Sequence, residues 1–228
     1  MADPAFLHGV ALFAGLSHDD MGSLVLSAHL RSFAGNATIF TQGDSGDGLY
    51  IVHTGQVKIV LYAEDGRESM IAIMSPGDCL GELAVLDGEP RSATAVALEP
   101  ATLWYLHRGE FLSSIKRHPD LAQKIITLLT RRLRQTDEQL GDLVFFDVFS
   151  RVAKRLLELA ASHGRPTDSG TVISLSMTQQ ELANLVGASR ESVNKALRLY
   201  RSQGYISVGK QRIVVHDPKG LRGYVEAA

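Results

Sequence analysis

The sequence predicts an α+β chain in which an antiparallel β-domain and a C-terminal helical domain are joined by one long helix. Three observations predict this fold class. Short β-rich runs alternate with turn residues between Ala37 and about Leu106, the stretch from Leu121 to Leu143 has helical periodicity, and two short capped helices follow from Thr178. With 228 residues, the chain is long enough for two domains with separate cores.

The β-rich region is predicted to form a small antiparallel barrel or jelly roll. Its runs recur about every ten residues, and turn combinations such as Asp65-Gly66 and Pro76-Gly77-Asp78 separate them. A short helix from Ser17 to Leu30 is expected to precede it. The predicted strands are Leu49–Val52, Gln56–Tyr62, Met70–Met74, Ser92–Ala97 and Thr102–Leu106.

The long helix carries a row of side chains at intervals of three and four residues, which is the a/d pattern of a coiled coil. This row, called the seam below, consists of Ile126, Leu129, Leu133, Thr136, Leu140 and Leu143. The seam predicts a parallel homodimer. The alternative, a helix lying on its own β-domain, explains a second stripe at Ile125 and Leu128 but leaves the seam without a partner. Thr136 is polar at a seam position, so we expect it to fix the register or to contact a ligand.

Charge is distributed unevenly along the chain. The net charge is −2, but residues 1–146 hold 11 Lys and Arg against 18 Asp and Glu, whereas residues 147–228 hold 12 against 7. This asymmetry indicates domains with different partners, and the basic one suits a polyanion. We place a hinge at Phe146-Asp147, where Asp147 can cap a new helix from Val148 to Ser162. The predicted segments are 1–120 for the β-domain, 121–146 for the dimerisation helix and hinge, and 147–228 for the C-terminal domain.

Composition excludes several classes of protein. Apolar residues make up 45% and charged residues 21% of the chain, as in ordinary folded domains. The N-terminus does not resemble a signal peptide and no apolar run reaches the roughly 18 residues of a membrane span, so we expect a cytoplasmic protein without a membrane partner. The single cysteine, Cys79, is expected to be a small buried hydrophobe. The histidines show no metal-ligand spacing and no nucleophile has a positioned base, so neither a metal site nor catalytic residues are expected.

The first segment with a chemical pattern runs from Leu80 to Ala93 and is called the cassette below. It contains Gly81-Glu82-Leu83-Ala84 and, after an intervening loop, Pro90-Arg91-Ser92-Ala93. A Gly that opens a short helical turn directs backbone N–H groups at one spot, and a guanidinium nine residues after the Glu can close over it. Such donors favour a phosphate, and the neighbouring carboxylate favours a sugar hydroxyl.

The cassette resembles the phosphate-binding cassette of cyclic-nucleotide-binding domains, found in bacterial cAMP receptor proteins and in kinase regulatory subunits. The resemblance implies that Glu82 holds the ribose 2′-OH, that Arg91 holds the cyclic phosphate, and that Ser92 and nearby backbone groups add phosphate bonds. An Arg91–Glu82 ion pair with only a structural role, and a cassette that has lost its ligand, are the alternatives. The candidate ligand-binding residues of the cassette are Gly81, Glu82, Leu83, Ala84, Arg91 and Ser92.

Two further ligand-binding candidates, Thr136 and Asp137, lie on the long helix. In the cAMP receptor branch, which this chain resembles, the long helix carries a Thr followed by a Ser, and these side chains, from the two subunits, face the adenine amino group. The corresponding pair in this chain is Thr136-Asp137. An ionised Asp137 could accept a hydrogen bond from the adenine amino group but would repel guanine O6, so cAMP is expected over cGMP. Alternatively, Asp137 simply faces water. The cysteine cluster of the FNR branch is absent, and with Glu82 and Arg91 intact neither an Fe–S cluster nor haem is expected.

The second segment with a chemical pattern begins at Thr178. Thr178 and Glu181 form a capping box that opens one helix, Gly187 ends it, and Ser189 caps the next, which predicts a helix-turn-helix. The second helix exposes polar side chains of the types that contact bases in a major groove, although a generic helical hairpin is the alternative. A loop from His163 to Gly170 and a strand from Thr171 to Leu175 are expected to precede it. The candidate DNA-binding residues are Thr178, Gln179, Ser189, Arg190, Glu191, Asn194, Lys195 and Arg198.

The run from Val186 to Leu197 resembles the recognition element of the cAMP receptor protein/FNR family of transcription regulators, and Tyr205–Val208, a Gly209–Gln211 turn and Arg212–Val215 resemble its β-hairpin wing. The resemblance implies a cytoplasmic, cAMP-responsive homodimer that binds palindromic double-stranded DNA, with RNA polymerase as a further partner. The alternatives are a regulator that acts without ligand, and a cyclic-nucleotide-binding regulatory subunit that acts on a protein partner.

Overall fold

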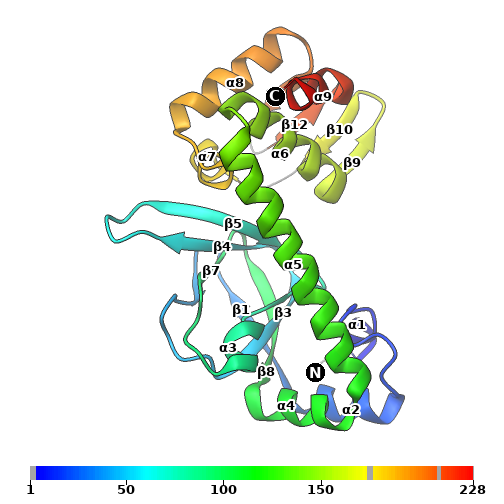
Figure 1. Cartoon of the computed structure of the whole chain (residues 1–228). Helices are drawn as coiled ribbons and strands as arrows, with labels where there is room; N and C mark the ends of the chain where they lie inside the picture. Colours follow the sequence, from blue (N-terminus) through cyan, green and yellow to red (C-terminus); the bar gives the residue numbers. More distant parts are fainter. Residues whose placement is uncertain (1–3, 174–176, 210–211, 228) are drawn as a thin grey trace. The chain divides into compact units, whose positions relative to one another are not determined.

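The structure, a computed structural model, describes residues 4–173, 177–209 and 212–227 (Figure 1). The chain divides into two compact units, residues 1–134 and 135–228. The division into three segments at residues 120 and 146 stays a prediction. Within the described residues, no helix combines the length and the apolar character needed to cross a membrane.

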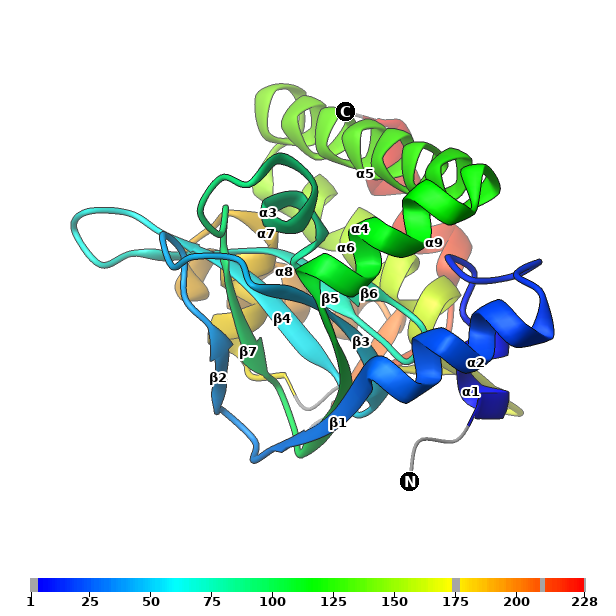
Figure 2. The same ribbon diagram turned by 90° about the horizontal axis from the view of Figure 1, so that it is seen from below.

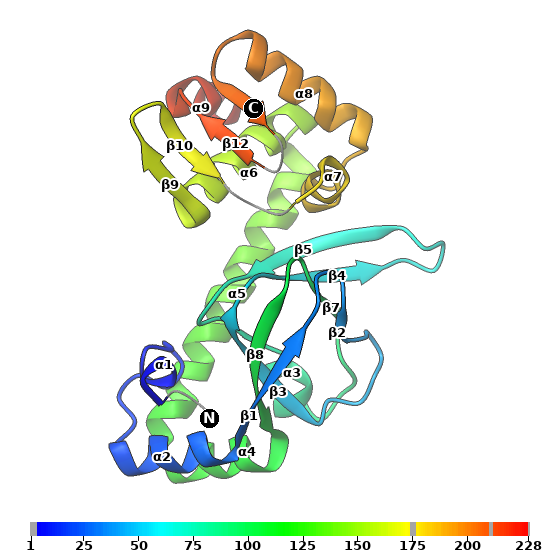
Figure 3. The ribbon, with the colours of Figure 1, turned by 180° about the vertical axis from the view of Figure 1, so that it is seen from behind.

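The first unit contains two separate antiparallel sheets, with strand orders β1-β8-β3-β6 and β2-β7-β4-β5 (Figure 3). Buried side chains from both sheets, among them Val52, Ile59, Ala95 and Leu103, form one core between them. The predicted jelly roll is therefore confirmed, as an open pair of sheets rather than a closed barrel. The strands are β1 (Ala28–Phe33), β2 (Thr38–Phe40), β3 (Gly48–Thr54), β4 (Val57–Tyr62), β5 (Glu68–Met74), β6 (Cys79–Leu80), β7 (Thr94–Ala97) and β8 (Ala101–His107).

The helix predicted from Ser17 to Leu30 is too long at its end. Helix α2 (His18–Ser27) begins after Ser17, whose hydroxyl accepts the N–H of Asp20, but the chain from Ala28 onward is strand β1. Strand β1 pairs with β8 over its whole length, so the backbone of Ala28 to Leu30 finds its hydrogen bonds in the sheet instead of a further helical turn.

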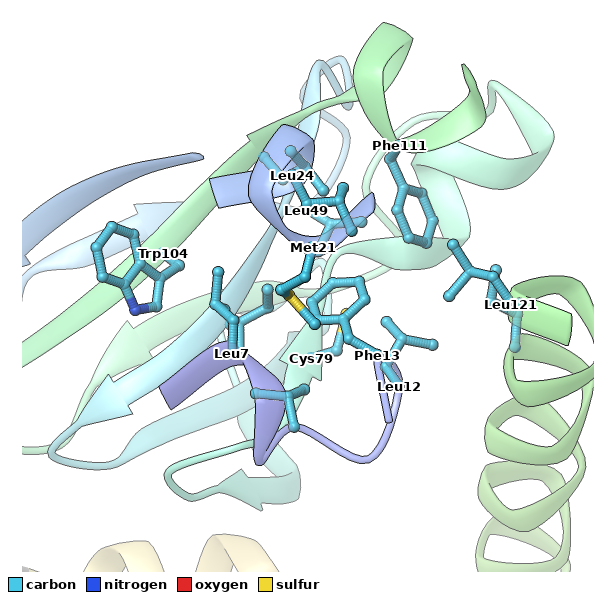
Figure 4. Close-up of a cluster of buried hydrophobic side chains, with 14 of the residues drawn as sticks. Leu7, Leu12, Phe13, Met21, Leu24, Leu49, Cys79, Trp104, Phe111 and Leu121 are labelled. Atoms are coloured by element: carbon cyan, nitrogen blue, oxygen red, sulfur yellow. The ribbon is translucent and has the colours of Figure 1, made fainter. Parts of the chain in front are cut away.

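A second core lies between the first sheet and the helices of this unit (Figure 4). Cys79 is buried in it with 3% of its surface exposed, as predicted, and Trp104 with 1%. Phe111 and Leu121 bring the fourth and fifth helices onto the same core. The helices that begin in this unit are α1 (Pro4–His8), α2, α3 (Glu82–Asp87), α4 (Arg108–Arg117) and α5 (Pro119–Phe145).

Helix α5 has two apolar stripes with different surroundings. Leu121 and Ile125 are buried in the core of the first unit, as expected for a helix lying on its own β-domain. Leu129, a seam residue, also packs against that core. The other apolar seam residues are more than half exposed in the single chain: Ile126 (64%), Leu133 (62%), Leu140 (61%) and Leu143 (52%).

The second unit holds the remaining elements around one sheet of order β11-β12-β10-β9. Asp147 caps α6 as predicted, because its carboxylate accepts the N–H of Ser150. The predicted loop from His163 to Gly170 is wrong in part, because Gly164–Thr167 forms strand β9 of a hairpin (Figure 3). Strand β9 lies at the edge of its sheet, where Pro166 is tolerated. The elements are α6 (Val148–His163), β9, β10 (Gly170–Ile173), α7 (Gln179–Val186), α8 (Arg190–Ser202), β11 (Ile206–Gly209), β12 (Arg212–Val215) and α9 (Pro218–Glu226).

Two predictions reach outside the described residues. The strand predicted from Thr171 to Leu175 is seen as β10 up to Ile173, and the next described residue is Met177. The wing is confirmed as the antiparallel pair β11 and β12, while its turn at Lys210-Gln211 lies outside the described residues.

Candidate functional site

The cassette folds as a glycine followed by the short helix α3. Gly81 precedes the helix with a φ of 79°, in the left-handed region that favours glycine. A Cβ at this position would lie 2.3 Å from Nη1 of Arg91, so a side chain would also displace the guanidinium. Gly46 allows a second close approach, since a Cβ there would lie 2.3 Å from the Cβ of Ala84. These two glycines let the loop before β3 and the guanidinium lie directly against α3.

Arg91 is a buried cation in the cassette. Its exposed fraction is 4%, and its guanidinium donates to the carbonyls of Gly81 (2.7 Å) and Gly48 (2.6 Å). The carboxylate of Asp47 is 3.8 Å from Nη2, and its side chain is largely exposed. Nε is buried without a hydrogen-bond partner among the described residues. A guanidinium has five N–H donors, so this buried charge retains donors for an anion.

Glu82 is a buried anion beside it. Only 2% of its surface is exposed, and its carboxylate accepts a hydrogen bond from the guanidinium of Arg132 on α5. Arg132 also donates to the carbonyl of Cys79. Among the described residues, Glu82 pairs with Arg132 and not with Arg91, so the alternative of an Arg91–Glu82 ion pair is wrong.

Sequence reasoning missed Arg132. The signal was present, since Arg132 lies four residues before the candidate Thr136 and therefore one turn away on the same helical face. Its approach to Glu82 depends on how α5 packs against the cassette, which local periodicity does not contain.

The other ligand-binding candidates differ in exposure. Ala84 is buried, whereas Leu83 (42%) and Ser92 are exposed. The structure thus brings Gly81, Glu82, Ala84 and Arg91 together around α3. Thr136 and Asp137 are exposed on α5 and fall in the second unit.

Burial and charge shift two pKa values near the cassette. Burial, reinforced by the charge of Glu82, raises the pKa of the Cys79 thiol, so it stays protonated and acts as a hydrophobe. Burial and then the charge of Asp47 raise the pKa of the Tyr105 hydroxyl.

The helix-turn-helix is formed by α7 and α8, with each predicted cap in place. Thr178 and Glu181 make the reciprocal bonds of a capping box, and Gly187 ends α7 in the left-handed region at a φ of 61°. Ser189 accepts the N–H of Ser192 at the start of α8. Helix α8 is anchored through a buried face that consists of Val193, Ala196, Leu197 and Tyr200.

The opposite face of α8 carries the DNA-binding side chains predicted for that helix, whereas Thr178 and Gln179 lie at the start of α7. Asn194 is half-buried, and Lys195 forms an exposed i,i+4 ion pair with Glu191 at 3.2 Å. Such a pair contributes only about 0.2–0.5 kcal/mol, so both side chains can reorient toward a ligand. The candidates that are exposed are Thr178, Gln179, Ser189, Arg190, Glu191, Lys195 and Arg198.

A second basic residue that sequence reasoning missed supports this motif. Arg151 on α6 donates to the carbonyl of Phe146 (2.8 Å), at the predicted hinge, and to that of Val186 (3.0 Å), at the end of α7. Arg151 therefore links Phe146, which lies just before α6, to the end of α7 in the helix-turn-helix.

Two family models match the chain. The cyclic nucleotide-binding domain matches residues 30–118, and the Crp-like helix-turn-helix domain matches residues 150–224. The chain is 37% identical over 210 residues to a CRP-like cAMP-activated global transcriptional regulator of Mycobacterium tuberculosis. This match covers 92% of this chain and 94% of that protein. The chain is 34% identical over 211 residues to the cyclic AMP receptor protein of Thermus thermophilus, with the same coverage of 92% and 94%. The solved structure of FixK2 from Bradyrhizobium japonicum, 23% identical, matches over 88% of this chain and 98% of its own with a TM-score of 0.79, which shows a shared fold.

Proposed function

Because the chain belongs to the cAMP receptor protein/FNR family of transcription regulators, we propose that it is a homodimeric DNA-binding regulator whose affinity for DNA is controlled by cAMP. The membership confirms the predicted fold class and the predicted class of protein, a transcription regulator rather than an enzyme. DNA as the partner of α7 and α8 follows from the same membership. A cytoplasmic location and RNA polymerase as a further partner are proposed on this family membership alone.

The observation that carries cAMP binding is the buried guanidinium of Arg91. Its charge lies in the cassette with two carbonyl acceptors, and among the described residues the carboxylate paired with it is that of the exposed Asp47, at 3.8 Å. A buried cation with remaining donors is stabilised by an anion that accepts from it, and a cyclic phosphate does so. Ser92 and the first N–H groups of α3, which have no intrahelical acceptor, would add donors to the phosphate.

Glu82 suits the ribose. An ionised carboxylate has about four acceptor positions, so Glu82 can keep its bond from Arg132 and still accept the 2′-OH. In this assignment Arg132 fixes the orientation of the carboxylate. Arg132 is thus a ligand-site residue beside the predicted ones.

Thr136 and Asp137 are proposed to meet the base. Adenine offers an amino donor to Asp137, whereas guanine presents an oxygen that an ionised carboxylate repels. We expect tighter binding of cAMP than of cGMP in a calorimetric titration. A titration in which cGMP binds tighter would overturn this assignment of Asp137.

The second copy of this chain is proposed to cover the seam. Ile126, Leu133 and Leu140 are each more than 60% exposed in the single chain, at the spacing of a coiled coil. A parallel dimer would bury them and would place two recognition helices about one turn of DNA apart, which implies a palindromic operator. A ligand that prefers the DNA-competent state a hundredfold, by about 2.7 kcal/mol, would raise that state from 1% to about half.

Arg91→Ala tests the phosphate assignment. Hydrogen bonds to charged groups contribute about 1.5–3 kcal/mol each, so loss of two should weaken cAMP binding at least a hundredfold. Calorimetry measures this loss, and a gel shift on palindromic DNA measures the accompanying loss of cAMP stimulation. Arg67→Ala, which removes the same side chain from an exposed position, is the matched control.

Because Arg91 also holds two backbone carbonyls, thermal unfolding must show that the Ala variant is folded. If it is not, Arg91→Lys, which keeps the charge but loses the bidentate geometry, replaces it and should also bind cAMP more weakly. Unchanged cAMP stimulation in a folded Arg91 variant would remove the phosphate assignment.

A further inference from the structure

We propose that Arg108 is a positioning residue that fixes the cassette helix to α4 and thereby passes ligand occupancy toward α5. This inference rests on the proposed cAMP-controlled DNA binding. Arg108 is half-buried at the first position of α4, and its Nε donates to the carbonyl of Val85 at 2.9 Å. Val85 belongs to the last turn of α3, where carbonyls have no intrahelical donor, and Arg108 supplies one.

The backbone of Arg108 is bonded to the other wall of the proposed phosphate site. Its N–H donates to the carbonyl of Asp47 at 2.8 Å, and the Asp47 carboxylate is the group 3.8 Å from Arg91. One residue of α4 therefore holds both the cassette helix and the loop that carries Asp47. Figure 2 shows α3 close to α4, which agrees with their contact in the fold.

Two arginines hold α3 at its opposite ends. Arg91 donates to Gly81 just before the helix, and Arg108 donates to Val85 near its end. A phosphate that binds the remaining donors of Arg91 pulls on the guanidinium that also holds the carbonyls of Gly81 and Gly48. The bond from Arg108 to Val85 does not involve this guanidinium, so it stays in place and links a displacement of α3 to α4.

Helix α4 is well placed to carry such a displacement. Phe111 is fully buried, so the helix moves with the core and not independently of it. The helix ends at Arg117 and α5 begins at Pro119, so His118 alone separates the two helices. The N–H of Leu121 donates to the carbonyl of His118 at 3.0 Å, which closes the junction. A shift of α4 is therefore a shift of the first turn of α5, the helix that bears the seam.

The test is the coupling between cAMP and DNA, measured as the fold by which saturating cAMP tightens binding of a palindromic duplex. Arg108→Met keeps an aliphatic side chain and removes every side-chain donor, while the backbone bond to Asp47 is kept. We expect its coupling to fall at least fivefold below wild type, a change equal to the lower end of typical allosteric couplings. By linkage, the fold by which DNA tightens cAMP binding should fall by the same factor. Arg117→Met, an exposed arginine on the same helix, is the matched control and should leave the coupling unchanged.

Arg108→Lys can still donate to Val85 and should recover most of the coupling. If Arg108→Met does not fold, Arg108→Leu, which also has no side-chain donor, is judged by the same criterion. Coupling within twofold of wild type in a folded Met or Leu variant would overturn the proposal, even if cAMP binds more weakly, because a purely local support changes affinity and not coupling. Absence of any cAMP stimulation in the wild type would overturn the proposed function and this inference together, whereas loss confined to the Arg108 variants without a side-chain donor supports both.

Discussion

Replacing Leu140 by Ala should weaken the homodimer without disturbing the chain that forms it. Leu140 is 61% exposed on α5, and Ala has the highest helix propensity, so the helix itself loses nothing. The exposed part of the side chain has no cover in the single chain, so the contact that the substitution removes there is the proposed one with the second copy.

The magnitude follows from the exposed fraction. Full burial of a leucine side chain contributes about 1.5–3 kcal/mol, so burying the exposed part of Leu140 contributes roughly 1–2 kcal/mol per chain. A two-fold interface contains the residue twice, and Ala retains a part of the contact. The dimer should therefore lose about 1.5–3 kcal/mol, which raises its dissociation constant about 10- to 150-fold.

Sedimentation equilibrium over a range of protein concentrations measures this constant. Leu26→Ala is the control, because Leu26 is 85% exposed but lies on α2, outside the seam. The reasoning is refuted if Leu140→Ala dimerises as tightly as wild type, or if Leu26→Ala weakens the dimer equally.

Two further predictions concern the recognition helix and the core. Lys195→Ala should cost roughly 1–3 kcal/mol of DNA binding on the cognate operator if Lys195 contacts a base; binding that weakens evenly across sequences, with a smaller salt slope, would show a phosphate contact instead. Since the pKa of Cys79 is raised in the folded state, the unfolded state loses its thiol proton first, and stability should fall as the pH rises above the ordinary thiol pKa of about 8.5. At pH 10 the wild type should have lost about 2 kcal/mol of unfolding free energy that Cys79→Ala does not lose, as measured by urea unfolding. Identical pH profiles of stability for the variant and the wild type would contradict this expectation.

The sequence-based prediction succeeded where local signals determine the structure. The caps at Asp147, Thr178 and Ser189 are side-chain bonds to neighbouring backbone groups, so their positions follow from local sequence. The seam of α5 is likewise a property of one helix, and its exposed leucines agree with the predicted spacing.

The misses depend on partners distant in the chain. Strand β1 has exposed central residues and no alternation, and only its pairing with β8 makes it a strand. Strand β9 contains a glycine and a proline that indicate a loop, yet hairpin pairing with β10 extends it. Arg132 and Arg108 approach the cassette from α5 and α4, across 50 and 23 residues of sequence, so their bonds to it depend on tertiary packing and not on local sequence.

Binding of a palindromic duplex, measured by fluorescence anisotropy with and without saturating cAMP, tests most directly whether the nucleotide controls DNA binding. The buried Arg91 and Glu82 in the cassette and the exposed face of α8 predict that cAMP tightens binding at least about fivefold. Equal affinity for the duplex with and without cAMP, in a dimeric and folded preparation, would contradict this prediction.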